Sequence, residues 1–155
     1  MDKETVIEKE HTYVRLLNSP IERVFQAWIK PEQLARWWGP ADFTNPVCEI
    51  DPNPGGALRI DMRDPEGKIF PMTGLVLEVF EPERLVFISQ PISEKGLPLF
   101  EVLNVITFKK ENNKTKMKIE ASVSKTAPGS ESYLAVMDEG WYQSLGRLEK
   151  FLSAA

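Results

Sequence analysis

The last part of the chain constrains the fold most. Apolar side chains recur there at spacings of three and four residues, and they belong to Leu134, Met137, Trp141, Leu145, Leu148 and Leu152. This spacing predicts one long amphipathic helix with a wide apolar stripe. Most of the chain before it reads as β-strands, so the stripe needs a large, curved sheet to lie against. One helix rarely fills the concavity of such a sheet, and we therefore expect a pocket between them.

Two segments show the alternation of a strand that is buried on one face only. Residues 57–63 and 115–123 place an apolar side chain at every second position, with charged or polar residues between. Residues 64–67, Asp-Pro-Glu-Gly, have the signature of a type I turn and predict a hairpin. Residues 68–80 are long for one straight strand, and Gly74 in their middle predicts a bulge or bend.

The N-terminal part predicts a strand followed by two short helices. Residues 12–17 read as the strand, and Ser19 and Pro20 then predict a helix that Ser19 caps and Pro20 begins. Pro31 ends this helix, and a second short one runs on to Trp38. The expected order is one strand, two short helices, six strands and the long helix.

Composition and charge exclude several classes of function. With 155 residues, 42% of them hydrophobic, the chain has enough apolar material for one domain. A net charge of −4, with its 19 basic residues spread thinly, argues against binding to nucleic acid or an anionic membrane. No apolar run approaches the roughly 20 residues that span a bilayer, so we expect no membrane insertion. Cys48 is the only cysteine, which fits a reducing, cytoplasmic location.

Several short motifs follow one another in a recognisable order. They are Trp37-Trp38, Asp51 with Pro54-Gly55-Gly56, Gly74 with Pro82-Glu83-Arg84-Leu85, and Gly140-Trp141 with Leu145 and Leu148. In this order they resemble the SRPBCC superfamily, the helix-grip fold shared by START-type lipid carriers, polyketide cyclases and the birch-pollen allergen. The resemblance is strongest to the branch named for homology to the C-terminal domain of the activator of heat-shock protein 90 ATPase.

This resemblance covers residues 12–152, nearly all of an expected single domain of residues 1–155. It implies an α+β helix-grip fold. In that fold a curved antiparallel sheet of about seven strands wraps around the long C-terminal helix, with two short helices after the first strand. It also implies a cavity between sheet and helix. Function transfers poorly with this fold, because its members include carriers and enzymes.

We expect the cavity to be lined by aromatic residues and by methionines, whose flexible thioethers suit ligands of irregular shape. The candidates are Trp37, Trp38, Phe43, Met62, Phe70, Met72, Met117, Met137 and Trp141. Ordinary core packing is the alternative for each of them. Because adjacent helical residues point about 100° apart, Trp37 and Trp38 cannot both face the same core, and we expect one of them at the cavity mouth.

The first hypothesis for function is a protein that binds an unknown small hydrophobic or amphipathic molecule in this cavity, as a monomer or a homodimer. The second hypothesis is a chaperone-associated, stress-response module that works through its outer surface. Its partner would be a chaperone, as the family resemblance implies. A cyclase-type or hydrolase-type enzyme is the third.

Catalysis has thin support in the sequence. His11 is the only histidine, and one histidine with one cysteine cannot supply a zinc site, so we expect no metal and no cofactor. Asp138 and Glu139 could in principle form an acid/base pair, but beside an apolar stripe they fit its solvent-facing rim better. Glu78, Glu101 and Asn104 fall within apolar strands, and their facing stays open.

Overall fold

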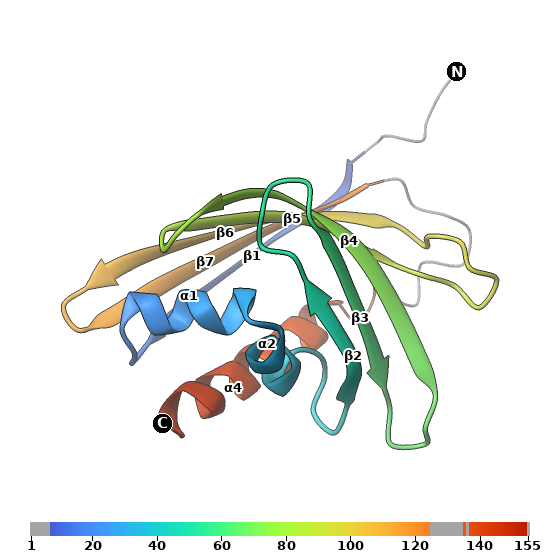
Figure 1. The fold of residues 1–155 in the computed structure, drawn as a ribbon, viewed down its shortest axis with the longest axis horizontal. Coiled ribbons are helices and arrows are strands. Elements are labelled where there is room, and N and C mark those ends of the chain that lie inside the picture. Colours follow the sequence, from blue (N-terminus) through green and yellow to red (C-terminus); the bar gives the residue numbers. More distant parts are fainter. Residues whose placement is uncertain (1–6, 125–134, 136, 155) are drawn as a thin grey trace.

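The chain forms an α+β structure in which one sheet curves around helices (Figure 1). The computed structural model describes residues 7–124, 135 and 137–154. Its antiparallel sheet has seven strands in the order β1-β7-β6-β5-β4-β3-β2. The strands are β1 (Ile7–Leu17), β2 (Thr44–Ile50), β3 (Ala57–Arg63), β4 (Ile69–Phe80), β5 (Arg84–Pro91), β6 (Glu101–Glu111) and β7 (Lys114–Ser124). The helices among the described residues are α1 (Ile21–Ile29), α2 (Pro31–Trp37) and α4 (Met137–Ser153).

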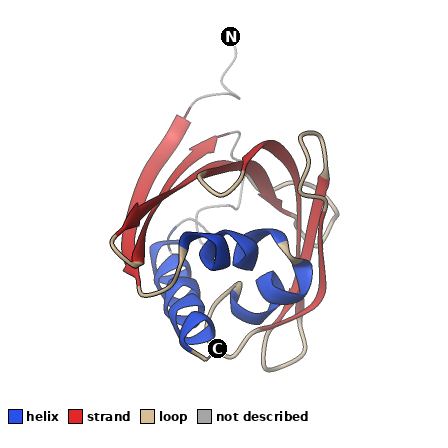
Figure 2. Ribbon diagram, turned by 60° about the vertical axis from the view of Figure 1, so that its left-hand side comes forward, coloured by secondary structure: helices blue, strands red, loops and turns tan. Residues whose placement is uncertain are grey.

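The helices occupy the concave side of the sheet. Figure 1 shows α1, α2 and α4 together on that side, and Figure 2 shows the strands arching over them. The alternation along β7 explains which face turns inward, because Met117 and Ile119 are buried whereas Lys116 and Lys118 are exposed. The order of elements and the curved sheet confirm the predicted helix-grip architecture.

The main core lies between the two short helices, the C-terminal half of α4 and the sheet. Trp28 of α1 packs edge-on against Trp37 of α2, with 4.7 Å between ring centroids. From α4, the buried apolar residues of this core are Leu145, Leu148 and Leu152. The N-terminal half of the predicted stripe differs, because Met137 and Trp141 are only half-buried. Leu134 lies outside the described residues.

The start of α1 differs from the prediction. Pro20, in an extended conformation, is the N-cap residue, and no side chain caps the helix. Ser19 is buried instead, and its carbonyl oxygen accepts a 2.7 Å hydrogen bond from the hydroxyl of Thr115. The backbone of Ser19 therefore connects the end of β1 to β7, and the N-cap position lies one residue later than predicted. The first strand is also longer than predicted, because it begins at Ile7.

The predicted hairpin between β3 and β4 is confirmed, but the irregularity in β4 is displaced. The Gly67 N–H donates to the carbonyl of Asp64, which closes the turn. The pairing of β3 with β4 is regular through Gly74, whereas the pairing of β4 with β5 shifts between Val76 and Glu78. Gly74 has another role, because a Cβ atom there would lie 2.2 Å from the carbonyl oxygen of Ile88. The close approach of two strands requires this glycine, not a bulge.

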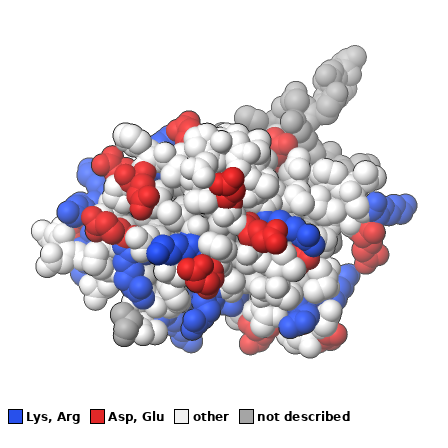
Figure 3. Space-filling view, viewed as in Figure 1, with Lys and Arg blue, Asp and Glu red and all other residues white. Residues whose placement is uncertain are grey.

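The surface mixes charges of both signs. Figure 3 shows Lys and Arg interspersed with Asp and Glu across one face of the molecule. Phosphate binding needs basic residues gathered in one place, and this face does not show such an arrangement. Within the ranges that the structure describes, none of the helices has the length and apolar character needed to cross a membrane.

The close approach at Gly74 generates a stability prediction. Gly74→Ala is expected to lower the free energy of unfolding by about 1–3 kcal/mol, because β4 and β5 must separate to admit the methyl group. Urea denaturation followed by circular dichroism measures the change. The control is Gly146→Ala in α4, where a Cβ atom meets open space, and it is expected to stabilise the protein by up to about 1 kcal/mol. An unchanged midpoint for Gly74→Ala would contradict the prediction.

Candidate functional site

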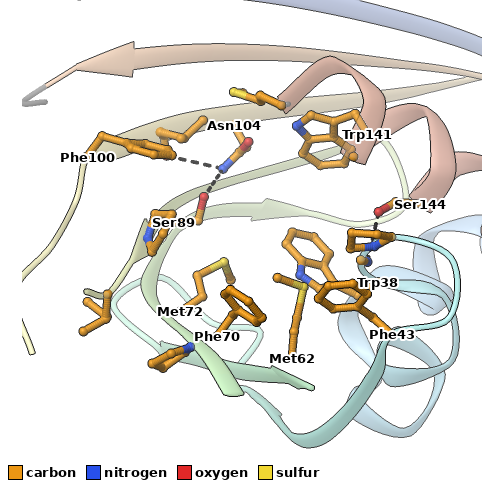
Figure 4. A pocket seen from close by; sticks show the side chains of 18 residues that line it. Trp38, Phe43, Met62, Phe70, Met72, Ser89, Phe100, Asn104, Trp141 and Ser144 are labelled. Atoms are coloured by element: carbon orange, nitrogen blue, oxygen red, sulfur yellow. Dashed lines mark hydrogen bonds between the residues drawn. The ribbon is translucent and has the colours of Figure 1, made fainter. Parts of the chain in front are cut away.

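A pocket of about 320 Å³ lies between the concave face of the sheet and the first turns of α4 (Figure 4). Its walls come from the segment after α2, from strands β3 to β6 and from α4. The 18 lining residues are Trp38, Gly39, Pro40, Phe43, Met62, Phe70, Pro71, Met72, Ser89, Pro91, Ile92, Phe100, Val102, Asn104, Met137, Gly140, Trp141 and Ser144. In the N-terminal half of α4, Trp141 packs against the main core with part of its surface and faces the pocket with another part.

Aromatic rings and thioethers form most of the wall. Trp38 and Trp141 meet edge-on with 5.7 Å between their centroids, and Phe43 lies 5.8 Å from Phe70. Met62 and Met72 reach into the pocket from β3 and β4 (Figure 4). Rings present flat apolar surfaces, and methionines adapt to the shape of what lies against them. The wall therefore suits a small apolar molecule and tolerates different ligand shapes.

Few polar groups interrupt this wall. Ser144 Oγ accepts a 2.9 Å hydrogen bond from the Gly39 N–H, so this hydroxyl is engaged in holding the neighbouring segment. Asn104 Nδ2 donates to Ser89 Oγ at 3.0 Å, and both residues are buried. The described lining holds no Asp, Glu, Lys, Arg, His or Cys. A charged ligand would lose its hydration here without meeting an opposite charge, so the pocket favours neutral molecules.

Side chains of α4 hold the segment that forms one wall. The Arg147 guanidinium donates to the carbonyl oxygens of Arg36, Trp38, Gly39 and Pro40 at 2.9–3.2 Å. Burial lowers the pKa of Arg147 below its usual value. One planar cation thus connects α4 to the end of α2 and to the three residues that follow it. Gln143 Oε1 accepts the Ala41 N–H at 2.8 Å and extends this contact.

A second depression, of about 540 Å³, lies at the other end of α4. It is larger, but only six residues line it: Leu16, Leu17, Asn18, Glu149, Leu152 and Ser153. Polar and charged residues make up half of this lining. The smaller pocket has more lining residues, most of them apolar, and it is the better candidate for a binding site.

The structure places seven of the nine candidate residues around the pocket. They are Trp38, Phe43, Met62, Phe70, Met72, Met137 and Trp141. Trp37 is fully buried in the core instead, where its Nε1 donates to the carbonyl oxygen of Ala27. Met117 is also fully buried, and β7 holds it against the core away from the pocket. The two adjacent tryptophans take different places because α2 ends at Trp37: Trp38 is the extended residue that follows the helix, and it lines the pocket.

Sequence reasoning missed the part of the wall that comes from β5, β6 and the segment between them. Pro91, Ile92 and Phe100 belong to this part, and a stretch with prolines and a glycine reads only as a loop. Asn104 carried a signal, since a polar residue within an apolar strand needs a partner. It faces inward, whereas Glu78 is exposed and accepts a hydrogen bond from Arg84. Glu101 is half-buried and accepts a hydrogen bond from Gln90.

The only histidine belongs to a polar cluster outside the pocket lining. His11 Nδ1 lies 2.7 Å from Asp138 Oδ1, and the Tyr13 hydroxyl donates to the same oxygen at 2.6 Å. Burial and the hydrogen bond to Asp138 raise the pKa of Tyr13 above its ordinary value, which makes its hydroxyl a poor nucleophile. Glu139 is exposed and accepts a hydrogen bond from Gln143.

The remaining chemistry-bearing groups add little to a catalytic reading. Burial, with a smaller effect of Glu49, raises the pKa of Cys48 to about 11. Its thiol is therefore protonated at neutral pH, unlike that of a nucleophilic cysteine. Among the described residues, no three or more of His, Cys, Asp and Glu gather as metal ligands would.

Comparison with known proteins places the chain in a family. A family model for activator of Hsp90 ATPase homolog 1-like proteins matches residues 18–153. The chain belongs to this family. The match confirms the resemblance stated from the sequence motifs, and it covers both walls of the pocket. No curated protein matches the chain.

Solved structures of bacterial proteins share the fold over nearly the whole chain. A protein of Nitrosomonas europaea is 27% identical with a TM-score of 0.75, and the alignment covers 99% of this chain and 97% of that one. A protein of Chromobacterium violaceum is also 27% identical, with a TM-score of 0.76 and coverage of 92% and 96%. A Silicibacter pomeroyi protein named AHSA1 is 19% identical, with a TM-score of 0.79 and coverage of 94% and 99%, and it supports the fold alone.

The contacts of Arg147 generate a prediction about the pocket wall. Arg147→Met is expected to lower the free energy of unfolding by about 2 kcal/mol and to speed hydrogen exchange at the Gly39 amide, because four carbonyl oxygens in this segment each lose a hydrogen bond. The control is Arg15→Met, which removes an exposed ion pair with Glu149 on the same helix. It is expected to cost less than about 1 kcal/mol. Equal losses in both variants would contradict the prediction.

Proposed function

We propose that this protein binds one small, neutral, mainly apolar molecule in the pocket between the sheet and α4. The observation that supports this best is the lining itself. It brings Trp38, Phe43, Phe70, Phe100 and Trp141 around one space, with methionines between them and no charged side chain among the described residues. Contacts of this kind favour removal of apolar ligand surface from water, at roughly 25 cal/mol per Å².

The volume bounds the size of the ligand. Pockets for drug-sized ligands occupy roughly 300–1,000 Å³, and this one, at about 320 Å³, lies at the lower limit. A compact molecule of one or two rings fits that space, whereas a long acyl chain would extend out of it. The proposal is therefore a small-molecule binding protein, with a location in the cytoplasm and a monomeric or homodimeric state as further expectations.

A chaperone-associated role is the second candidate, and the family description supports it. An activator acts by touching its partner, so the working residues would lie on the outer surface and not in the pocket. Measuring the ATPase rate of the Hsp90-type chaperone of the same cell, with and without this protein, tests the role. A stimulation that persists when the pocket is filled would favour it.

An enzyme of the cyclase or hydrolase type receives less support. Such chemistry needs a titratable group with a shifted pKa inside the pocket, and the described lining supplies none. The His11, Asp138 and Tyr13 cluster does not line the pocket. Binding, without conversion of the ligand, is thus the activity that this geometry supports.

The first experiment is identification of what the protein binds in its own cell. Protein purified under native conditions is analysed by native mass spectrometry, and fluorescence of Trp38 and Trp141 follows removal and return of any bound molecule. A stoichiometric, neutral, compact ligand that changes this fluorescence is the expected result. A protein that emerges empty and binds no apolar probe would overturn the proposal.

Gly140 provides a variant that fills the pocket without disturbing the helix. It lines the pocket, and a Cβ atom at this position meets nothing within 4 Å. Gly140→Leu is expected to weaken binding of the neutral fluorescent probe N-phenyl-1-naphthylamine at least tenfold, because the new side chain occupies the binding space. Leucine also has the higher helix propensity, so the fold should be retained.

Gly146→Leu is the matched control. Gly146 lies on the same helix and also has open space beside it, but it does not line the pocket. Its replacement is expected to leave probe affinity within twofold of the wild type. Equal probe affinity in the wild type and Gly140→Leu would place the probe elsewhere and count against the pocket.

A further inference from the structure

Asn104 is a polar residue at the inner end of an apolar pocket. It extends from the concave face of β6, its side chain is 1% exposed, and it belongs to the pocket lining. Its neighbours on the same face of β6 are the apolar residues Val102 and Ile106. Burial of a carboxamide is costly unless both its donor and its acceptor are paired. The partners of the amide nitrogen and of the amide oxygen of Asn104 therefore need to be identified.

The donor end of Asn104 is fully engaged. Nδ2 lies 3.3 Å from the carbonyl oxygen of Phe87, 3.3 Å from that of Val102 and 3.0 Å from Ser89 Oγ. Two of these partners are carbonyl oxygens, which only accept hydrogen bonds, so the nitrogen must face them. The orientation of the carboxamide is thereby determined, and Oδ1 must point the other way.

The acceptor end has no partner. Asn104 Oδ1 is buried and forms no hydrogen bond in the described structure. Figure 4 shows this oxygen turned away from Ser89, toward the side of the pocket where Trp141 lies. A buried acceptor without a donor costs roughly 1–3 kcal/mol, so its presence calls for an explanation.

The cover over this end of the pocket is adaptable. Met137 lines the pocket and packs against the cluster that contains Val102 and Ala121. Val102 lies two residues from Asn104 on β6, and Ala121 pairs with Asn104 across the sheet. Met137 therefore belongs to the pocket wall near Asn104, and its unbranched thioether moves aside more easily than backbone or a ring.

We propose that Asn104 Oδ1 accepts a hydrogen bond from an N–H or O–H group of the ligand. This inference rests on the proposed function and narrows the ligand class. The ligand is a compact, neutral, mainly apolar molecule with a hydrogen-bond donor at the end that enters first, such as a heteroaromatic N–H, an amide or a hydroxyl group. The amide nitrogen of Asn104, by contrast, already donates to Phe87, Ser89 and Val102, so Asn104 itself recognises a donor and not an acceptor.

Two isosteric probes test donor recognition directly. Indole and benzofuran have nearly the same shape, but only indole has an N–H donor. Isothermal titration calorimetry on the wild type is expected to give roughly five- to tenfold tighter binding of indole, the range that one additional hydrogen bond supplies. In Asn104→Leu, which keeps the side-chain volume but removes the acceptor, the two affinities should agree within twofold, with benzofuran still bound.

A control variant separates lost recognition from lost stability. Thr115→Val removes another buried hydrogen bond, the one to Ser19, and Thr115 does not line the pocket. It is expected to keep the preference of the wild type for indole. Should Asn104→Leu fail to fold, the carboxamide ¹³Cγ signal of Asn104 in the wild type decides, because indole should shift it and benzofuran should not.

The outcomes distinguish the inference from the function on which it rests. Equal affinities of the two probes in the wild type, with an unmoved ¹³Cγ signal, overturn donor recognition and leave the binding function intact. Binding of neither probe overturns the binding function and the inference together. A preference for indole that survives Asn104→Leu overturns the role of Asn104.

Discussion

The contact of α4 with the sheet is the constraint on which the rest of the structure depends. Leu145, Leu148 and Leu152 complete the core, so the C-terminal half of the helix is fixed by burial of apolar surface. Arg147, on the same half, donates to the carbonyl groups that end α2 and thereby ties the Trp38 segment to the helix. In the N-terminal half, Asp138 is hydrogen-bonded to Tyr13 of β1, whereas Met137 and Trp141 are only half-buried and line the pocket. The position of α4 on the concave face of the sheet thus determines the core, the wall formed by the Trp38 segment, and the pocket.

The architecture was predictable because the strands and the long helix each bury one face only, which gives their apolar residues a regular spacing in the sequence. The alternation in residues 57–63 and 115–123 and the helical stripe each state which face is apolar, and the structure confirms strands and helix. Local details were less predictable. Ser19 has the chemistry of a cap, but its carbonyl oxygen is bonded to Thr115, a residue distant in sequence. Gly74 indicated a bulge, but the irregularity in the strand follows Val76. A glycine at position 74 has a second possible cause, the close approach to Ile88, and the sequence alone does not distinguish the two.

Much of the candidate site could be predicted from residue type, and the remainder depends on which side of an element a residue faces. Trp37 and Trp38 have the same chemistry, and only the end of α2 decides that one enters the core and the other the pocket. Met117 resembles Met62 and Met72 in sequence, but it lies on a strand that the core covers. Asn104 and Ser89 meet across β6 and β5, a contact that no local pattern contains.

Gly140 and Asn104 are two features of the pocket lining that do not favour stability. An exposed or half-buried helical position normally gains up to about 1 kcal/mol from alanine in place of glycine. At residue 140 a larger apolar side chain would also fill the open space beside Trp141 and bury additional surface, yet the chain has glycine there. The unpaired oxygen of Asn104 adds a second unfavourable feature to the same space. The proposed ligand, which fills the volume and donates one hydrogen bond, would account for both features.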